Sequence, residues 1–251
     1  VIIRSDARRV PLASESVELI LSDPPYGVLT HTQSLARTGI ADIVRYQEWD
    51  NLTLEQWQEL MLLSFREWYR VAKVGATCYC FCAGEFLGYL REIGEYTGWR
   101  WRMPVYFHMT NPAPKIRFVA FQSSVQSFGM FVKECTATFN VKNGGLCHNL
   151  FEYASPIPSQ RSHPTQKSLG LMMDLIRISS NPGDMVLDTF TGSGTTGEAA
   201  KLLGRRYVCG ELDWGYLRHA QWRTTNVVGA EGPGYVEDLP LMKLLEGVGY
   251  G

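Results

Sequence analysis

The chain has 251 residues, of which 45% are hydrophobic and 20% are charged, and this composition excludes a disordered or fibrous protein. Its 24 basic and 25 acidic residues give a net charge of −1, so bulk charge cannot hold nucleic acid and any contact with it must be local. There is no apolar run of the roughly 18 residues that a membrane span needs, no basic-then-apolar leader and no CxxC pair. We expect a cytoplasmic protein with reduced cysteines and no membrane partner.

Hydrophobic periodicity predicts alternating strands and helices along the chain. An apolar run at 17–21 predicts a strand that stops before Pro24 and Pro25, because proline cannot continue a ladder. From Thr53 the spacing predicts a helix that begins with a Thr53–Gln56 capping box and is closed by Gly75. Further strands are predicted at 76–82, 101–109, 127–132, 185–188 and 207–210, and further helices at 85–96, 166–180, 195–203 and 215–227.

This alternation predicts an α/β fold, a mainly parallel sheet with helices on both faces. Residues 134–162 carry Asn, Gly, Ser and Pro with little periodicity, so they predict an irregular insert. Residues 229–251 form a glycine-rich tail without a strong signal. Cys78, Cys80 and Cys82 alternate along one strand and are expected to share a buried face.

A glycine-rich turn lies between the strand at 185–188 and the helix that follows it. Gly192, Gly194 and Gly197 have the spacing GxGxxG, and Glu211 follows Gly192 by 19 residues. Glycines at a helix N-terminus let the backbone approach a ligand closely, and an acid about 20 residues further on can hold ribose hydroxyls. The turn therefore predicts a nucleoside-containing cofactor, with NAD, FAD and S-adenosylmethionine all open. A Walker A loop is disfavoured because Glu198 stands where it needs lysine.

An acidic proline motif, Asp23-Pro24-Pro25-Tyr26, follows the first predicted strand. The exocyclic amine of adenine or cytosine is a poor nucleophile because its lone pair is delocalised into the ring. The Asp23 carboxylate and the Pro24 carbonyl can accept both N–H bonds and free that lone pair. Pro25 would stiffen the turn, and Tyr26 offers a ring face for an unstacked base. The alternative reading is an ordinary Asx-Pro turn with a packed tyrosine.

The two motifs together resemble the S-adenosylmethionine-dependent DNA amino-methyltransferases, which carry DPPY and FxGxG motifs. The acidic motif comes first, since Asp23 precedes Gly192 by 169 residues, and this order resembles the beta class. Asp6-Ala7, Asn-Pro at 111–112 and His-Pro-Thr-Gln-Lys at 163–167 resemble further segments of the family. The chain departs from the family at Ser168, where proline is usual, and at Met109, where lysine is common.

The resemblance implies a Rossmann-like methyltransferase fold with a seven-stranded sheet and a circularly permuted motif order. It implies transfer of a methyl group from S-adenosylmethionine to the N6 amine of a flipped adenine in double-stranded DNA, which leaves S-adenosylhomocysteine. Adenine is favoured over cytosine because an initial Asp, rather than Ser, is commoner in adenine-modifying relatives. An N4-cytosine methyltransferase, an RNA methyltransferase and a non-catalytic DNA-binding module are the alternatives.

The resemblance also assigns roles to residues. Asp23, Pro24, Pro25 and Tyr26 would be catalytic, Glu211 would hold the cofactor's ribose and Asp6 would approach its adenine. Thr165 and Lys167 would approach the methionine carboxylate. The full set of expected cofactor-binding residues is Asp6, Ala7, Asp23, Thr165, Lys167, Asp188, Thr189, Phe190, Gly192, Ser193, Gly194, Thr195, Thr196, Glu211 and Leu212.

Basic residues provide the candidate DNA contacts. Those between 99 and 133 outnumber the acids there and predict a phosphate-facing surface, although a plain solvated face is equally consistent. The polar stretch 27–50 has the length of a lid or binding loop. The candidates are Arg37, Arg45, Arg100, Arg102, Lys115, Arg117 and Lys133.

We expect one methyltransferase domain over 1–251, with a catalytic half at 1–133, a target-recognition insert at 134–162, a cofactor-binding half at 163–228 and a tail at 229–251. The insert has 29 residues, which is short for reading several base pairs, so we expect either a short or relaxed target sequence or help from a homodimer partner. The resemblance implies a bacterial or phage protein and leaves a cognate restriction endonuclease open. No metal is expected, because Cys135, Cys147 and His148 have the wrong spacing for a zinc finger.

Overall fold

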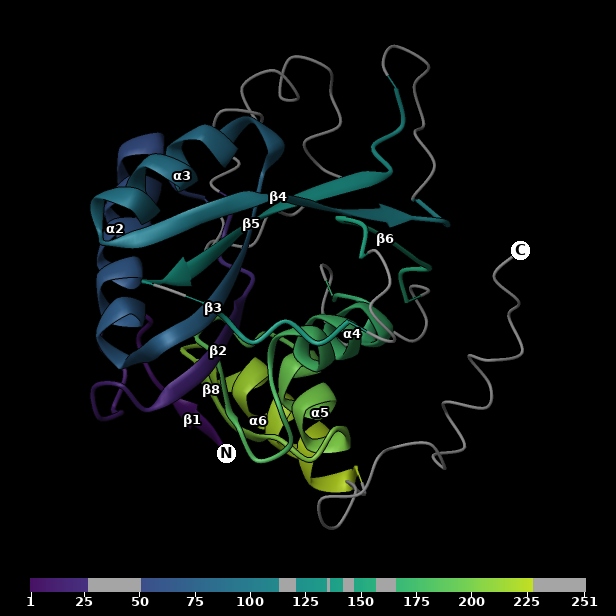
Figure 1. Cartoon of the computed structure of the whole chain (residues 1–251). Helices are drawn as coiled ribbons and strands as arrows, with labels where there is room; N and C mark the ends of the chain where they lie inside the picture. The colour runs from purple at the N-terminus through teal and green to yellow at the C-terminus, as the bar shows by residue number, and fades with distance from the viewer. Residues whose placement is uncertain (27–50, 113–120, 135, 142–146, 157–165, 228–251) are drawn as a thin grey trace.

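The computed structural model describes residues 1–26, 51–112, 121–134, 136–141, 147–156 and 166–227 (Figure 1). Its centre is an eight-stranded sheet with the order β1-β8-β7-β2-β3-β5-β4-β6. The strands are β1 (Ile2–Arg4), β2 (Val17–Ser22), β3 (Ala72–Cys82), β4 (Trp99–Met109), β5 (Val125–Lys133), β6 (Leu150–Tyr153), β7 (Met185–Asp188) and β8 (Arg206–Glu211). The helices are α2 (Leu54–Val71), α3 (Leu87–Tyr96), α4 (Leu169–Ser179), α5 (Thr195–Leu202) and α6 (Trp214–Asn226), and a 3₁₀ turn, η2 (Gly84–Phe86), precedes α3.

Seven of the strands run in one direction and β5 alone runs against them, because β5 pairs antiparallel with both β3 and β4 and every other pairing is parallel. This confirms the predicted α/β fold with a mainly parallel sheet. The expected number of seven strands is wrong, since the sheet has eight. The parallel direction also means that the carboxyl ends of the seven strands meet at one edge, where ligands bind in such folds.

Two strands, β1 and β6, have no predicted counterpart. The three residues of β1 pair with Cys209, Gly210 and Glu211 at the end of β8. The four residues of β6 lie within the stretch 134–162 and pair in parallel with β4. The prediction that this stretch is wholly irregular is therefore wrong for Leu150–Tyr153.

Helices cover both faces of the sheet, with α2 and α3 on one face and α4 and α5 on the other (Figure 1). Successive side chains of a strand point to opposite faces, and β3 shows this alternation in its core contacts. Cys78, Cys80 and Cys82 pack in the cluster with α2, as predicted, while Tyr79 and Phe81 pack in the cluster with α4. Among the helices of the described ranges, none is both long and apolar enough to cross a membrane.

The start of α2 confirms the capping box, whereas its end differs from the prediction. The Gln56 N–H donates to Thr53 Oγ1 at 3.2 Å, and the Thr53 N–H donates to Gln56 Oε1 at 2.9 Å. The helix ends at Val71 rather than at Gly75, and Gly75 has φ 83° inside β3. The register shifts there from Val17–Ala72 to Leu19–Thr77, so Gly75 lies in a bulge. A positive φ favours glycine equally in a bulge and after a helix, which explains the error.

The other predicted elements match with small shifts at their ends. The helix predicted at 166–180 begins only at Leu169, and the one predicted from residue 85 is preceded by η2 and begins at Leu87. β3 begins at Ala72, four residues before the predicted start at 76. The remaining boundaries differ from the predictions by at most two residues, which is the usual variation in assigning element ends.

Lys133 is a core residue, and this burial contradicts its prediction as part of a phosphate-facing surface. It is 5% exposed, and its ammonium donates to the main-chain carbonyls of Tyr69 at 3.1 Å and Ala72 at 2.9 Å. The ammonium also lies 4.5 Å from the centroid of the Tyr69 ring. These carbonyls lie at the C-terminal end of α2, where the helix dipole attracts a cation. Lys133 therefore ties β5 to the end of α2.

We expect Lys133→Met to lower the free energy of unfolding by about 1–3 kcal/mol, because it leaves buried carbonyls without donors. Urea denaturation measures this change. Arg100→Gln is the matched control, since Arg100 is exposed at the start of β4 and a surface change of this kind shifts stability by about 0.5 kcal/mol or less. A Lys133→Met protein as stable as the wild type would contradict this role.

Candidate functional site

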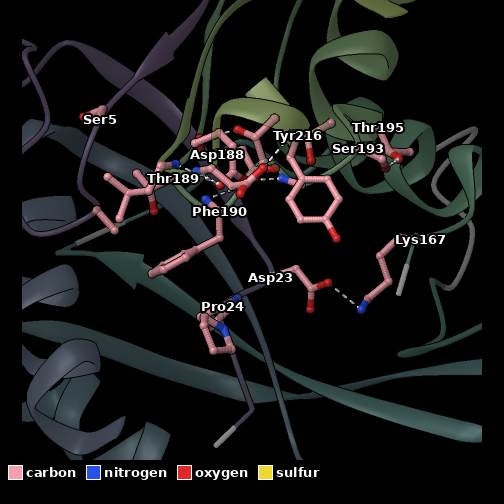
Figure 2. Close-up of a pocket in the computed structure, with 18 of the residues that line it drawn as sticks. Ser5, Asp23, Pro24, Lys167, Asp188, Thr189, Phe190, Ser193, Thr195 and Tyr216 are labelled. Atoms are coloured by element: carbon pink, nitrogen blue, oxygen red, sulfur yellow. Dashed lines mark hydrogen bonds and ion pairs between the residues drawn. The ribbon is translucent and has the colours of Figure 1, made fainter. Parts of the chain in front are cut away.

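A pocket of about 550 Å³ lies at the carboxyl ends of β1, β2, β7 and β8 (Figure 2). This volume is within the range of small-molecule sites. The acidic proline motif and the glycine-rich turn, which are far apart in the sequence, both line it. The expected site residues among its lining are Asp6, Ala7, Asp23, Pro24, Pro25, Tyr26, Lys167, Asp188, Thr189, Phe190, Gly192, Ser193, Thr195, Thr196, Glu211 and Leu212.

The pairing of β2 with β7 brings the two motifs together. Ser22, the last residue of β2, donates from its hydroxyl to Asp188 Oδ1 at 3.2 Å and accepts from the Thr189 N–H at 3.3 Å. Trp68 of α2 donates from its indole N–H to Thr189 Oγ1 at 3.0 Å. These bonds fix the start of the glycine-rich turn against the residue that precedes Asp23.

The glycine-rich turn has the backbone that its sequence predicts. Gly192 has φ 51° and Gly194 has φ 83°, and Gly194 is the N-cap of α5. A Cβ on Gly194 would lie 2.9 Å from the Cα of Ala220 in α6, so a side chain there would collide with backbone. Gly194 does not line the pocket; it lets α5 begin close to α6. The N-terminus of α5 consequently opens toward the pocket, with Thr195 and Thr196 in its wall.

Glu211 is held in place by three backbone donors. Its Oε2 accepts from the Gly192 N–H at 2.8 Å, and its Oε1 accepts from Leu212 at 2.8 Å and Asp213 at 2.9 Å. Burial raises the pKa of this carboxyl above its ordinary value, and the three donors oppose that rise. The carboxylate is thereby fixed at the end of β8, in the wall of the pocket where the sequence placed a ribose-binding acid.

Asp188 is a buried carboxyl at the end of β7. Its Oδ1 accepts from the Phe190 N–H at 3.0 Å as well as from Ser22. Burial, with a smaller contribution from the charge of Asp23, raises the pKa of Asp188 to about 7. The pocket therefore contains a carboxyl that changes charge near neutral pH.

Asp23 takes part in a buried network with Lys167 and Tyr26. The Lys167 ammonium lies 2.6 Å from Asp23 Oδ2, and the Tyr26 hydroxyl donates to Asp23 Oδ1 at 2.8 Å. Lys167 also lies 3.2 Å from the Tyr26 hydroxyl, and burial keeps the pKa of that hydroxyl well above its ordinary value. Lys167 thus reaches Asp23, a contact that the sequence did not predict.

Sequence reasoning missed Trp57, which lies beside the pocket, and the lining residues Ser5, Arg8, Leu52, Leu60, Gln126, Gln166, Met172, Thr191, Asp213 and Tyr216. Trp57 of α2 donates from its indole N–H to the Pro25 carbonyl at 2.9 Å and so holds the proline turn. Its helical spacing indicated only a core residue, although a buried indole N–H needs an acceptor. Gln126 lines the pocket, and its Oε1 is buried without a partner among the described residues. Its position at the start of β5 carried no signal in the sequence.

Several predicted site residues are not placed in the pocket. Arg100 and Arg102 are exposed near the start of β4, at the edge of the sheet opposite the pocket, so their contact with DNA stays a prediction. Among the described residues, no group of three His, Cys, Asp or Glu side chains is arranged to hold a metal ion. Thr165, Arg37, Arg45, Lys115, Arg117 and Cys135 lie outside the described residues.

Comparisons with known proteins support the family resemblance that the acidic proline motif and the glycine-rich turn indicate. A family model, N6_N4_Mtase, described as DNA methylase, matches residues 17–222. The chain is 28% identical over 241 residues to the type II methyltransferase M.HinfI of Haemophilus influenzae, covering 86% of this chain and 65% of the length of that protein. A solved structure of the M1.HpyAVI–SAM complex is similar with a TM-score of 0.69 and 25% identity, covering 90% of this chain and 98% of the other. The cytosine-N4-specific PvuII DNA methyltransferase shares the fold, with a TM-score of 0.70 and 17% identity over 98% of this chain and 89% of the other.

The raised pKa of Asp188 predicts a pH-dependent stability. Because folding raises this pKa from 3.8 to about 7, the folded state binds the proton more tightly. The contribution is fully present below the unfolded pKa and is lost as the pH rises through about 7. We expect wild-type protein to lose up to about 4 kcal/mol of unfolding free energy relative to Asp188→Asn between pH 4 and pH 8.

Urea denaturation at several pH values measures this difference, with Glu95→Gln, an exposed change on α3, as the control. A wild-type-minus-Asp188→Asn difference that stays constant from pH 4 to pH 8 would contradict the assignment.

Proposed function

This chain belongs to the N6/N4 DNA methylase family, and on that premise we propose that it transfers a methyl group from S-adenosylmethionine to the N6 amine of an adenine flipped out of double-stranded DNA. The observation that carries the proposal is the shared pocket, which is lined by both Asp23 and the glycine-rich turn with Glu211. Direct methyl transfer requires the target amine and the cofactor to occupy neighbouring sites.

The residues of the pocket fit S-adenosylmethionine. Asp188 and Glu211 supply carboxyl groups, and the ligand offers an ammonium, a sulfonium and two ribose hydroxyls as partners for them. Glu211 is fixed by three backbone donors and retains one lone pair on Oε2 that can accept a ribose hydroxyl. A cofactor with phosphates would meet negative charge at the same places. When bound, S-adenosylmethionine supplies a methyl group on a positively charged sulfur.

The proline motif acts on the target amine. The Asp23 carboxylate accepts one amine N–H and the Pro24 carbonyl accepts the other, which draws the nitrogen toward tetrahedral geometry and frees its lone pair. Trp57 binds the neighbouring Pro25 carbonyl, which holds the turn in place. As the nitrogen gains the methyl group it loses one proton, and Asp23 lies on that proton's path. Tyr26 orients the Asp23 carboxylate through its hydroxyl and offers its ring to the flipped base.

Cytosine is the second candidate base, because its N4 amine presents the same two N–H bonds beside a ring nitrogen. The similarity in fold to the cytosine-N4-specific PvuII enzyme is the reason to retain cytosine as a candidate. Adenine is preferred because the motif begins with Asp23, and an initial Asp is commoner in adenine-modifying relatives.

The test is incubation of the protein with methyl-labelled S-adenosylmethionine and unmethylated genomic DNA, followed by digestion to nucleosides. We expect label in N6-methyldeoxyadenosine. Label in N4-methyldeoxycytidine would retain the reaction and replace the base. A parallel incubation with cellular RNA that gives labelled RNA, while the DNA stays unlabelled, would contradict the proposal.

Asp23→Asn tests the role of the carboxylate with little change of shape. We expect the rate of methyl transfer to fall by about 100-fold or more, because an amide is a weaker acceptor for the amine than a carboxylate. Binding of S-adenosylhomocysteine, followed by calorimetry, should persist. Glu95→Gln is the control and should transfer at the wild-type rate, since Glu95 is exposed on α3 away from the pocket. Undiminished transfer by Asp23→Asn would exclude this mechanism.

A further inference from the structure

Lys167 is the most buried charged side chain in the Asp23 network. Its side chain is 5% exposed and that of Asp23 is 19% exposed, and the two point toward each other across the pocket (Figure 2). The ammonium also lies 5.4 Å from the ring centroid of Tyr26 and 5.0 Å from that of Phe81. An anionic partner stabilises a buried ammonium in such surroundings, because an unpaired charge there is costly.

The contact with Lys167 is unproductive for methyl transfer. Tyr26 donates to Asp23 Oδ1 and Lys167 donates to Oδ2, so a target amine would have to share an oxygen with an ammonium. The positive charge beside the carboxylate also weakens its pull on an amine N–H. In addition, an ammonium beside the amine would repel the positive sulfur of the methyl donor. Transfer is therefore favoured when Lys167 takes another partner.

The pocket leaves Lys167 as the cation for an incoming carboxylate. Among the described residues that line it, only Arg8 and Lys167 carry positive charge. Arg8 is already bound to Asp6, at 2.6 Å between Nη2 and Oδ2. Lys167 has a flexible four-carbon stem that can redirect its ammonium, and it lies just before α4, whose Met172 also lines the pocket.

We propose that Lys167 is a positioning residue that alternates between two carboxylates, that of Asp23 and that of the methionine part of the cofactor. The cofactor's carboxylate takes the ammonium, and this frees Asp23 Oδ2 for the target amine. Cofactor binding thereby promotes engagement of the target base, and the two binding events strengthen each other. This inference rests on the proposed function.

Two ligands separate this role from a merely structural one. S-adenosylhomocysteine carries the amino-acid carboxylate, and 5′-methylthioadenosine shares its adenosine and sulfur without that carboxylate. By calorimetry, we expect Lys167→Gln to weaken binding of S-adenosylhomocysteine by about tenfold, as for a lost charge-assisted bond, and to leave 5′-methylthioadenosine within about twofold.

Asp23→Asn is expected to change the affinity for S-adenosylhomocysteine in the opposite direction. In this variant no carboxylate at position 23 competes with the ligand for Lys167. S-adenosylhomocysteine should therefore bind several-fold more tightly to Asp23→Asn than to wild type, and the affinity for 5′-methylthioadenosine should be unchanged. If Asp23 instead attracted the ligand's ammonium, the same change would weaken binding. The prediction for Asp23→Asn remains informative if Lys167→Gln does not fold.

The proposal would be overturned if Lys167→Gln lost the same affinity for both ligands, or if S-adenosylhomocysteine bound more weakly to Asp23→Asn than to wild type. Neither measurement contains DNA. A failure here therefore differs from failure of the proposed function, which shows as absence of label in DNA.

Discussion

The parallel pairing of β2 with β7 is the constraint on which the site depends. Leu19 lies beside Val186 and Ile20 beside Leu187, and all four side chains are fully buried. This register carries Ser22 to Asp188, residues 166 positions apart, and places the acidic proline motif and the glycine-rich turn side by side. The hydrophobic core thus determines the distance between the two halves of the chemistry. A change in this register would separate them even if each motif kept its own local structure.

Charge within the pocket is the second determinant of its behaviour. Burial raises the pKa of Asp188 to about 7, and the charge of Asp23 makes a smaller contribution to that rise. Negative charge at this density suits a ligand that carries positive groups, and it requires at least one cation to offset it. Lys167 meets that need through its contact with Asp23. Because the lysine is shared, binding at one half of the pocket changes what the other half can bind.

Much of the fold was predictable, because its signals are local. The Thr53–Gln56 box, the alternation of three cysteines along β3 and the turn at Gly192 and Gly194 all depend on neighbouring residues. Errors arose where the decisive partner lies far away in the sequence. Lys133 resembles a surface lysine until the end of α2 is seen beside it. The four residues of β6 are too few to show a period of two among turn-forming residues.

The candidate site shows the same difference between features with a local sequence signal and contacts between distant segments. The lining residues that belong to the two motifs were identified from motif and resemblance, whereas lining residues such as Gln126 and Tyr216 were not. The contact between Lys167 and Asp23, 144 positions apart, has no signature in either segment. The most direct test of the account is a crystal structure with S-adenosylhomocysteine bound. We predict a ribose hydroxyl on the Glu211 carboxylate, the amino-acid carboxylate on Lys167, and Asp23 open beside the sulfur. A ligand outside this pocket, or a ribose turned away from Glu211, would contradict the account.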